Sequence, residues 1–189
     1  MKARHIPNII SVCRILLVYP VVASILQKRF DWALTLFVVA GVSDALDGFL
    51  AKHFHWQSRL GSYIDPLADK LLLVSSYIVL SSMGLLPFWL SATVVLRDVV
   101  IFTGAVLYYF LLRPFEGQPL LISKVNTLLQ LFLVFIVLLH NGFVPLPAGL
   151  ITGLIAVVFV TTLASGALYV YIWGSSYYRE TRVAGMRND

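Results

Sequence analysis

The sequence has little charge and almost no cysteine. Charged residues make up 12% of its 189 residues, whereas a water-soluble domain of this size carries about 25%. The single cysteine, Cys13, cannot form an intrachain disulfide and so carries no information about the redox compartment. No basic block is longer than two residues, so the net charge of +5 does not indicate nucleic-acid binding. Hydrophobic residues make up 59% of the chain, at a mean hydropathy of +0.88. This composition predicts a protein of the lipid bilayer.

Apolar residues gather in about six long segments. Each is close to the ~20 residues that a helix needs to cross ~30 Å of hydrocarbon. The segments are roughly 6–26, 32–50, 63–86, 88–112, 120–140 and 148–173. The first is not typical of a secretory signal, since it is long, contains Arg14 and lacks a clear cleavage site after it. We therefore predict an all-α, polytopic membrane protein with about six transmembrane helices, formed as a single domain over residues 1–189.

The basic residues predict the orientation of this bundle. If both termini are cytoplasmic, that side collects nine lysines and arginines, and the opposite side receives only Lys28 and Arg29. Such an asymmetry is typical of the positive-inside rule. The loop around residues 54–60 is then cytoplasmic. Because no transit peptide is evident, we expect a bacterial plasma membrane and not a mitochondrial one.

Four of the nine acidic residues lie in one stretch, residues 43–70. Asp44 and Asp47 are three residues apart, and Asp65 and Asp69 are four apart, so on helices each pair shares one face. An ionised side chain at mid-helix costs about 2.5–3.5 kcal/mol in a bilayer. Two carboxylates ~5 Å apart also repel each other by roughly 3 kcal/mol at an effective dielectric of ~20. These costs require a counter-charge.

The nearby cations are too few to neutralise the four aspartates. Lys52 and Lys70 supply two positive charges against four negative ones. Carboxylate oxygens from two facing helices suit hard divalent ions such as Mg²⁺, Mn²⁺ or Ca²⁺, and the stretch has no thiolate for zinc. Bound Mg²⁺ usually partners phosphates, and two metal ions suit displacement at a phosphorus atom. The stretch therefore predicts lipid phosphoryl chemistry at the cytoplasmic face.

These residues resemble the signature of the CDP-alcohol phosphatidyltransferase family. The signature reads D-x-x-D-G-x-x-A-R, eight or nine residues, then G-x-x-x-D-x-x-x-D. Here the first half runs from Asp44 to Lys52 and the second from Gly61 to Asp69, with eight residues between them. The opening "IPNIISVCRILL" also resembles the first helix of the family. The outline of six helices is similar to that of the family as well, so the likeness extends over nearly the whole chain. Lys52 departs from the family's arginine; it keeps the charge but loses the two-pronged grip on phosphate.

The resemblance implies transfer of a phosphatidyl group from CDP-diacylglycerol to an alcohol, with release of CMP and a requirement for Mg²⁺ or Mn²⁺. It implies that two metal ions on the donor diphosphate are held by Asp44, Asp47, Asp65 and Asp69. It also implies that Asp69 is the general base for the acceptor hydroxyl. By the same likeness the donor is bound by Gly48, Lys52 and Gly61. A homodimer is implied by the resemblance alone.

The signals for the acceptor lie outside this stretch. "SYIDPLADKLLL", "LRDVVI" and "ISKVNTLLQ" resemble the branch that uses glycerol-type acceptors. Phosphatidylglycerophosphate synthases, which use glycerol 3-phosphate, tend to have a lysine where this chain has Asn126 and an arginine where it has Ala105. A dianionic acceptor calls for more cations. The absence of this lysine and this arginine therefore favours phosphatidylglycerol as acceptor and hence cardiolipin synthesis. Phosphatidylglycerophosphate synthesis is the alternative.

Four residues are candidates to contact this acceptor: Arg14, Arg97, Lys124 and Asn126. Each also has a simpler interpretation. Arg14 and Lys124 could snorkel to the cytoplasmic interface. Arg97 could form a buried structural ion pair with Asp98, and Asn126 could hydrogen-bond a neighbouring helix. A function of another class, divalent-cation transport, would more naturally place its acids near the bilayer midplane in repeated halves.

Overall fold

The computed structural model describes residues 6–54, 61–111 and 121–185. These residues form six helices and no strand, which confirms the all-α prediction. The helices are α1 (Ile6–Leu26), α2 (Phe30–His53), α3 (Gly61–Ser82), α4 (Phe88–Leu111), α5 (Leu121–Gly142) and α6 (Ala148–Gly185). Each corresponds to one of the six apolar segments of the sequence.

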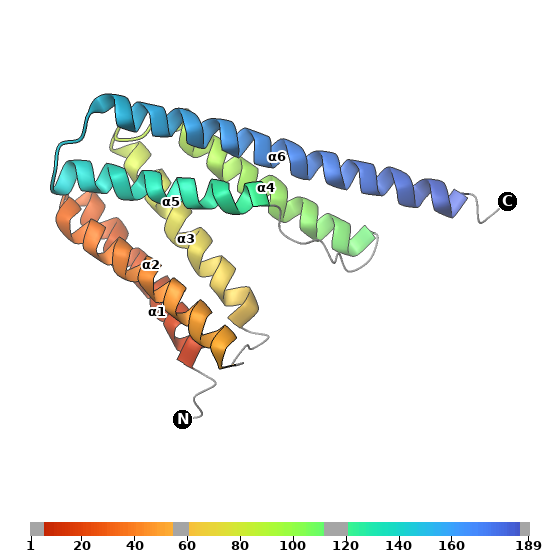
Figure 1. Cartoon of the computed structure of the whole chain (residues 1–189), viewed down its shortest axis with the longest axis horizontal. Coiled ribbons are helices and arrows are strands. Elements are labelled where there is room, and N and C mark those ends of the chain that lie inside the picture. Colours follow the sequence, from red (N-terminus) through yellow and green to blue (C-terminus); the bar gives the residue numbers. More distant parts are fainter. Residues whose placement is uncertain (1–5, 55–60, 112–120, 186–189) are drawn as a thin grey trace.

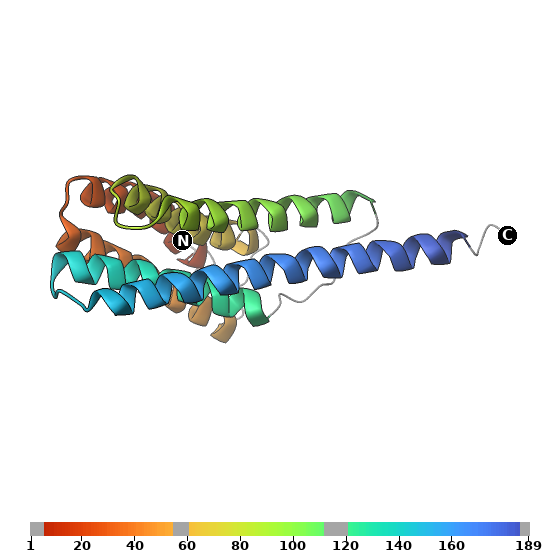
Figure 2. The same ribbon diagram turned by 90° about the horizontal axis from the view of Figure 1, so that it is seen from above.

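The last helix is longer than its apolar segment. α6 has 38 residues and continues past residue 173, where the apolar run ends, to Gly185. No proline occurs between residues 148 and 185, so nothing in the sequence blocks the continued backbone hydrogen bonding. At 1.5 Å per residue this helix is about 57 Å long. Figures 1 and 2 show its C-terminal part projecting beyond the other helices.

The helices pack as two connected groups of three. α1 packs against both α2 and α3, and α6 packs against both α4 and α5. Contacts of α2 with α5 and of α3 with α4 join the two groups. In Figure 1, α5 and α6 run along the top of the molecule while α2 and α3 slant away below them.

Tight turns join the helices at one end of the bundle. Two residues after the end of α1, Lys28 has a positive φ of 59°, and the amide of Arg29 donates to the Ser24 carbonyl. Two residues after the end of α3, Gly84 has a φ of 73°. Both are the left-handed caps that satisfy the last carbonyls of a helix. At the end of α5, a side chain on Gly142 would meet backbone atoms of α2 at 2.9 Å, so only glycine permits this close approach.

The hydrophobic core lies toward these turns. It contains side chains from all six helices, including Ile25 of α1, Phe37 of α2, Tyr77 of α3, Leu90 of α4 and Leu133 of α5. The buried charged residues lie elsewhere, as described below. The apolar core thus holds one end of the bundle together and leaves the polar residues toward the other end.

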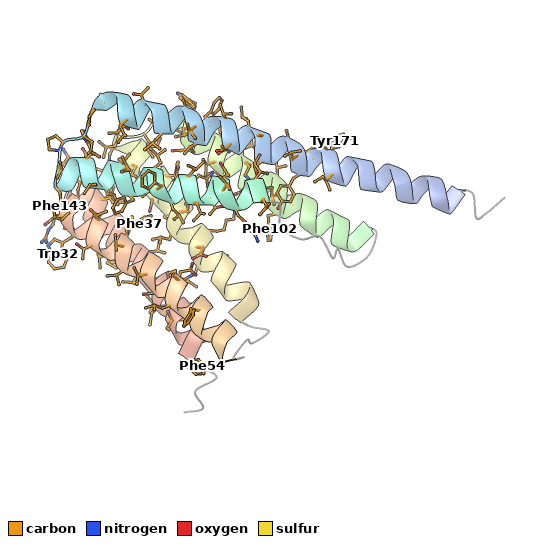
Figure 3. All side chains as sticks on the ribbon, viewed as in Figure 1. Trp32, Phe37, Phe54, Phe102, Phe143 and Tyr171 are labelled. Carbon is orange, nitrogen blue, oxygen red and sulfur yellow. The ribbon has the colours of Figure 1, made fainter. Side chains whose placement is uncertain are left out.

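The outer surface is apolar. Large exposed apolar side chains occur on every helix; Trp32, Phe102 and Tyr171 can be followed in Figure 3, as can Phe143 in the turn after α5. Within the described residues, Leu121–Gly142 and Ala148–Ile172 are long and apolar enough to cross a membrane. A contiguous exposed apolar surface is typical of contact with lipid. These features agree with a membrane protein; the six spans, the single domain and the cytoplasmic termini stay predictions.

Candidate functional site

Two helices carry the four aspartates of the signature. Asp44 and Asp47 lie in the second half of α2, and Asp65 and Asp69 lie in the first half of α3. The structure describes the side chains of Asp44 and Asp69. The side chains of Asp47, Asp65 and Lys52 lie outside the described part of the structure, as do the surroundings of Gly61.

Arg14 connects the two described aspartates. Its Nη1 lies 2.7 Å from Oδ1 of Asp44 and 2.6 Å from Oδ1 of Asp69. The Arg14 side chain is fully buried, whereas each carboxylate is 43% exposed. One guanidinium nitrogen of α1 therefore joins carboxylates from α2 and α3. These three residues are called the Arg14 cluster below.

The position of Arg14 bears on one of its two interpretations, snorkelling to the membrane interface. A snorkelling side chain would reach the surface of the protein, but Arg14 is only 1% exposed. The snorkelling interpretation is therefore wrong, because the tie to two carboxylates holds the guanidinium inside the bundle. The acceptor contact predicted for Arg14 stays a prediction.

The Arg14 cluster has the chemistry of a hard-cation site. One guanidinium faces two carboxylates, so the cluster keeps a net charge of about −1 even before Asp47 and Asp65 are counted. Each carboxylate has two oxygens and can bind a second partner while it accepts from Arg14, and both carboxylates are exposed enough to be reached. Oxygen ligands of this kind suit Mg²⁺ or Mn²⁺. Among the side chains that the structure describes, no three acidic, His or Cys residues gather.

Gly48 leaves open space beside the cluster. It lies on α2 one turn after Asp44, so the two share a face of the helix. A side chain at this position would meet no described atom within 4 Å. Close packing of Gly48 against another described helix is therefore excluded. The bare backbone is open to a large ligand, as the prediction of donor binding requires.

An apolar groove begins one turn from each described aspartate. It has a volume of about 340 Å³ and lies between α2, α3 and α5. Its lining includes Gly41, three residues before Asp44, and Leu72, three residues after Asp69. The rest of the lining is apolar, with Phe37, Leu128, Leu131 and Phe135 among its members. A hydrocarbon chain fits a surface of this chemistry.

A second polar cluster surrounds Arg97 of α4. Its Nη1 donates to Oδ1 of Asp98 at 2.7 Å, and its Nη2 donates to the hydroxyls of Ser123 and Ser165 at 2.6 Å each. Nζ of Lys70 also contacts Oδ1 of Asp98. These five residues, called the Arg97 cluster below, connect α3, α4, α5 and α6. The predicted alternative of a buried Arg97–Asp98 ion pair is thus present.

The Arg97 cluster carries the opposite charge to the Arg14 cluster. Two cations, Arg97 and Lys70, share the single carboxylate of Asp98, which leaves a net charge of about +1. Asp98 is 9% exposed, and its Oδ2 accepts no hydrogen bond from any described residue. The side chain of Lys70 is 44% exposed. A positively charged group is therefore accessible at the residue that follows Asp69.

Sequence reasoning did not assign a site role to Lys70, Ser123 or Ser165. Lys70 entered only as a possible counter-charge for the aspartates. On a helix, adjacent residues point about 100° apart, so Lys70 faces α4 while Asp69 faces α1. Asp98 lies within the apolar segment 88–112, where a charge needs partners. This was the signal that could have identified Lys70 as a second partner of Asp98. The two serines gave no such signal.

Asn126 and Lys124 have different surroundings on α5. Asn126 is fully buried, and its Oδ1 accepts hydrogen bonds from Thr161 at 2.8 Å and Thr162 at 3.0 Å. Gln130, one turn later, donates to Thr162 at 3.2 Å. Asn126 therefore bonds to a neighbouring helix, which was one of its two interpretations, and its contact with the acceptor stays a prediction. Lys124 is exposed, as its predicted contact with an acceptor or the interface requires.

Comparison with known proteins is consistent with this site. A family model described as CDP-alcohol phosphatidyltransferase matches residues 4–173. A probable cardiolipin synthase (CMP-forming) of Drosophila melanogaster is 38% identical over 142 residues, which cover 67% of this chain and 44% of the fly protein. The cardiolipin synthase (CMP-forming) of Rattus norvegicus is 37% identical over 68% of this chain and 48% of its own length. The chain thus spans about half the length of these two relatives.

A third relative has a different printed activity. The CDP-diacylglycerol–glycerol-3-phosphate 3-phosphatidyltransferase of Bacillus subtilis is 29% identical over 156 residues, which cover 72% of this chain and 78% of that protein. The printed names therefore differ: the fly and rat names specify cardiolipin synthesis with formation of CMP, and the Bacillus subtilis name specifies CDP-diacylglycerol and glycerol 3-phosphate.

Proposed function

Because the chain belongs to the CDP-alcohol phosphatidyltransferase family, we propose that it moves a phosphatidyl group from CDP-diacylglycerol to a glycerol-type alcohol. The acceptor oxygen bonds to the phosphorus of the phosphatidyl group, the bond to the CMP oxygen breaks, and CMP leaves. The observation that carries this proposal is the convergence of Asp44 and Asp69, from two helices of the signature, on Arg14. It supports one shared site for the two halves of the signature.

The donor is proposed to lie over the exposed side of the Arg14 cluster. Asp44, Asp47, Asp65 and Asp69 would hold two Mg²⁺ or Mn²⁺ ions. When bound, such ions neutralise the diphosphate and the charge that develops on the attacking and leaving oxygens. Gly48 would admit the cytidine diphosphate against the bare backbone of α2, and Gly61 and Lys52 would complete its binding. The apolar groove beside Gly41 and Leu72 would receive an acyl chain.

Asp69 is proposed as the general base. Its carboxylate is 43% exposed, so an acceptor hydroxyl can reach it. The hydroxyl proton would pass to Asp69 as the oxygen begins to bond to phosphorus, because the hydroxyl becomes a stronger acid at that moment. Arg14 holds the same carboxylate from the buried side and so fixes the direction in which it can accept the proton.

We propose phosphatidylglycerol as the acceptor, which makes the product cardiolipin. Arg97 is already bound by Asp98 and two serines. Among the described residues near it, Lys70 of the same cluster and Lys124 of α5 are accessible cations. A phosphodiester with one negative charge needs fewer counter-cations than the dianionic glycerol 3-phosphate. Arg97, Arg14 and Asn126 would shape this region from its buried side. The names of the fly and rat relatives also favour this acceptor.

The proposed setting is a membrane crossed by all six helices, with the site and both termini on the cytoplasmic side. The length of α6 supports this, because about 57 Å exceeds the ~30 Å of hydrocarbon. Its last part, with Arg179 and Arg182, must then leave the bilayer. A bacterial plasma membrane and a homodimer stay predictions; the relatives come from a fly, a rat and a bacterium.

A direct assay tests the reaction. Purified full-length protein in detergent is incubated with CDP-diacylglycerol and Mn²⁺ or Mg²⁺. The acceptor is phosphatidylglycerol or glycerol 3-phosphate and, in separate reactions, serine or inositol. CMP release is measured and the lipid product is identified by mass spectrometry. We expect CMP and cardiolipin with phosphatidylglycerol. A lack of CMP with every glycerol, serine or inositol acceptor would overturn the enzyme proposal.

The alternative acceptor is glycerol 3-phosphate. The Bacillus subtilis relative favours it, since its printed name specifies that acceptor and the chain covers 78% of its length. If phosphatidylglycerophosphate is the product of the assay, the reaction class stands and the choice of acceptor is overturned. Membership of a phosphatidyltransferase family removes the basis for the transporter alternative.

A further inference from the structure

Arg14 contacts both of its aspartate partners through the same nitrogen atom. A single nitrogen, Nη1, contacts one oxygen from each of two carboxylates that belong to different helices. The two oxygens are therefore no more than 5.3 Å apart, a separation at which like charges repel strongly inside a protein. The positive charge between them offsets that repulsion.

Arg14 also lies on the helix that separates its two partners in the packing. α1 packs against both α2 and α3, so a cation on α1 reaches Asp44 and Asp69 from their buried side. The side chains of Asp44 and Asp69 each remain 43% exposed. Arg14 thus offsets part of the charge of the pair and leaves part of each side chain accessible to a metal ion.

We infer that Arg14 is a positioning residue: a built-in counter-cation that holds Asp44 and Asp69 together before a metal ion binds. The inference rests on the proposed function, because it assumes that the exposed oxygens receive Mg²⁺ or Mn²⁺. It predicts that the protein depends most on Arg14 when metal is absent. A bound divalent ion supplies the missing positive charge and makes the loss of Arg14 less damaging.

Thermal unfolding of the full-length protein in detergent tests this inference. The unfolding midpoint is recorded in EDTA and in saturating Mn²⁺ for the unmodified protein and for Arg14→Gln. Arg14 is buried, but its two partners are 43% exposed, so solvent screening makes the loss smaller than for a fully buried ion pair. We expect Arg14→Gln to lower the midpoint in EDTA by about 5 °C. We expect Mn²⁺ to recover at least half of that loss. The rise in midpoint caused by Mn²⁺ is then larger in Arg14→Gln than in the unmodified protein.

Arg97→Gln is the matched control. Arg97 is buried like Arg14, at 6% exposed, but its carboxylate partner Asp98 is not part of the signature. We expect Arg97→Gln to lose stability as well, with the same Mn²⁺-induced rise as the unmodified protein. An equal rise in Arg14→Gln and Arg97→Gln would overturn the inference and would show a merely structural role for both arginines.

A double variant keeps the test decisive if Arg14→Gln does not fold in EDTA. Adding Asp44→Asn to Arg14→Gln removes one of the two repelling charges, so we expect the double variant to fold in EDTA with a higher midpoint than Arg14→Gln. A lower midpoint would overturn the inference. If Mn²⁺ does not raise the midpoint of the unmodified protein at all, the metal site of the proposed function fails instead. The two failures are therefore distinguishable.

Discussion

The Arg14 cluster and the Arg97 cluster are both built around an arginine that is almost fully buried, at 1% and 6% exposed. Their partners differ. Arg14 is shared by two carboxylates from other helices, each 43% exposed. Arg97 is enclosed by its neighbour Asp98 and by two serine hydroxyls. The two clusters therefore do not differ in the burial of the arginine; they differ in the exposure of its carboxylate partners.

The two clusters also have opposite charge. Carboxylates are in excess at Arg14, which suits metal ions, and cations are in excess at Arg97, which suits a phosphate. Asp69 belongs to the first cluster and Lys70 to the second, so adjacent residues of α3 join them. A reaction between a metal-bound diphosphate and an anionic acceptor needs these two environments side by side. The contrast leads to three predictions, of which one changes the Arg14 cluster and two change the Arg97 cluster.

The largest effect is expected for Asp69→Asn. An amide cannot take the acceptor proton, so we expect CMP release to fall by about 10³-fold. Arg14 keeps Asp44 as its partner, so the unfolding midpoint should stay within a few degrees of that of the unmodified protein. Both quantities are measured on the same purified sample. Normal turnover in Asp69→Asn would refute the assignment of Asp69 as general base.

Asp98→Asn is expected to act on stability. It leaves Arg97 and Lys70 without the carboxylate that they share, and removal of one member of a buried pair costs about 3 kcal/mol or more. We expect the midpoint of thermal unfolding in detergent to fall by roughly 6–12 °C. The same substitution at Asp69 serves as the control. Equal stability of the two variants would show that the clusters do not differ in the way proposed.

Lys70→Gln is expected to have the smallest effect. Lys70 is the accessible cation of the Arg97 cluster. Its loss should therefore weaken binding of the acceptor by about tenfold, near 1.4 kcal/mol of binding free energy. We expect a higher KM for phosphatidylglycerol and an unchanged KM for CDP-diacylglycerol. Lys124→Gln gives a comparison at a second exposed lysine. A rise confined to the KM of the donor would instead place Lys70 at the diphosphate.

Local patterns in the sequence were enough to predict much of the architecture. The six apolar segments match the six helices because a run of about 20 apolar residues has few alternatives to a helix. The one clear difference, the extension of α6 to Gly185, occurs because the end of an apolar run is not a helix stop signal. The aspartate stretch could be identified for a similar reason, since its spacing on a helix and its cost in lipid are both local properties.

Contacts between distant residues could not be predicted in this way. Arg14 and Asp69 are 55 residues apart, and Arg97 and Ser165 are 68 apart. Hydropathy gives the same value to Arg14 whether its side chain reaches the membrane–water interface or contacts two carboxylates inside the bundle. Hydropathy also does not identify the partner of Asp98, because its contact with Lys70 depends on how α3 packs against α4.

The chain alone thus specifies six helices, the residues of the aspartate signature and an apolar exterior, because each follows from residue type and spacing within about 20 positions. The packing of the helices specifies which charges meet. It places Arg14 under Asp44 and Asp69, and it places Lys70 against Asp98. A charge inside a low-dielectric bundle must find a partner, and which partner it finds depends on the helix faces that come into contact.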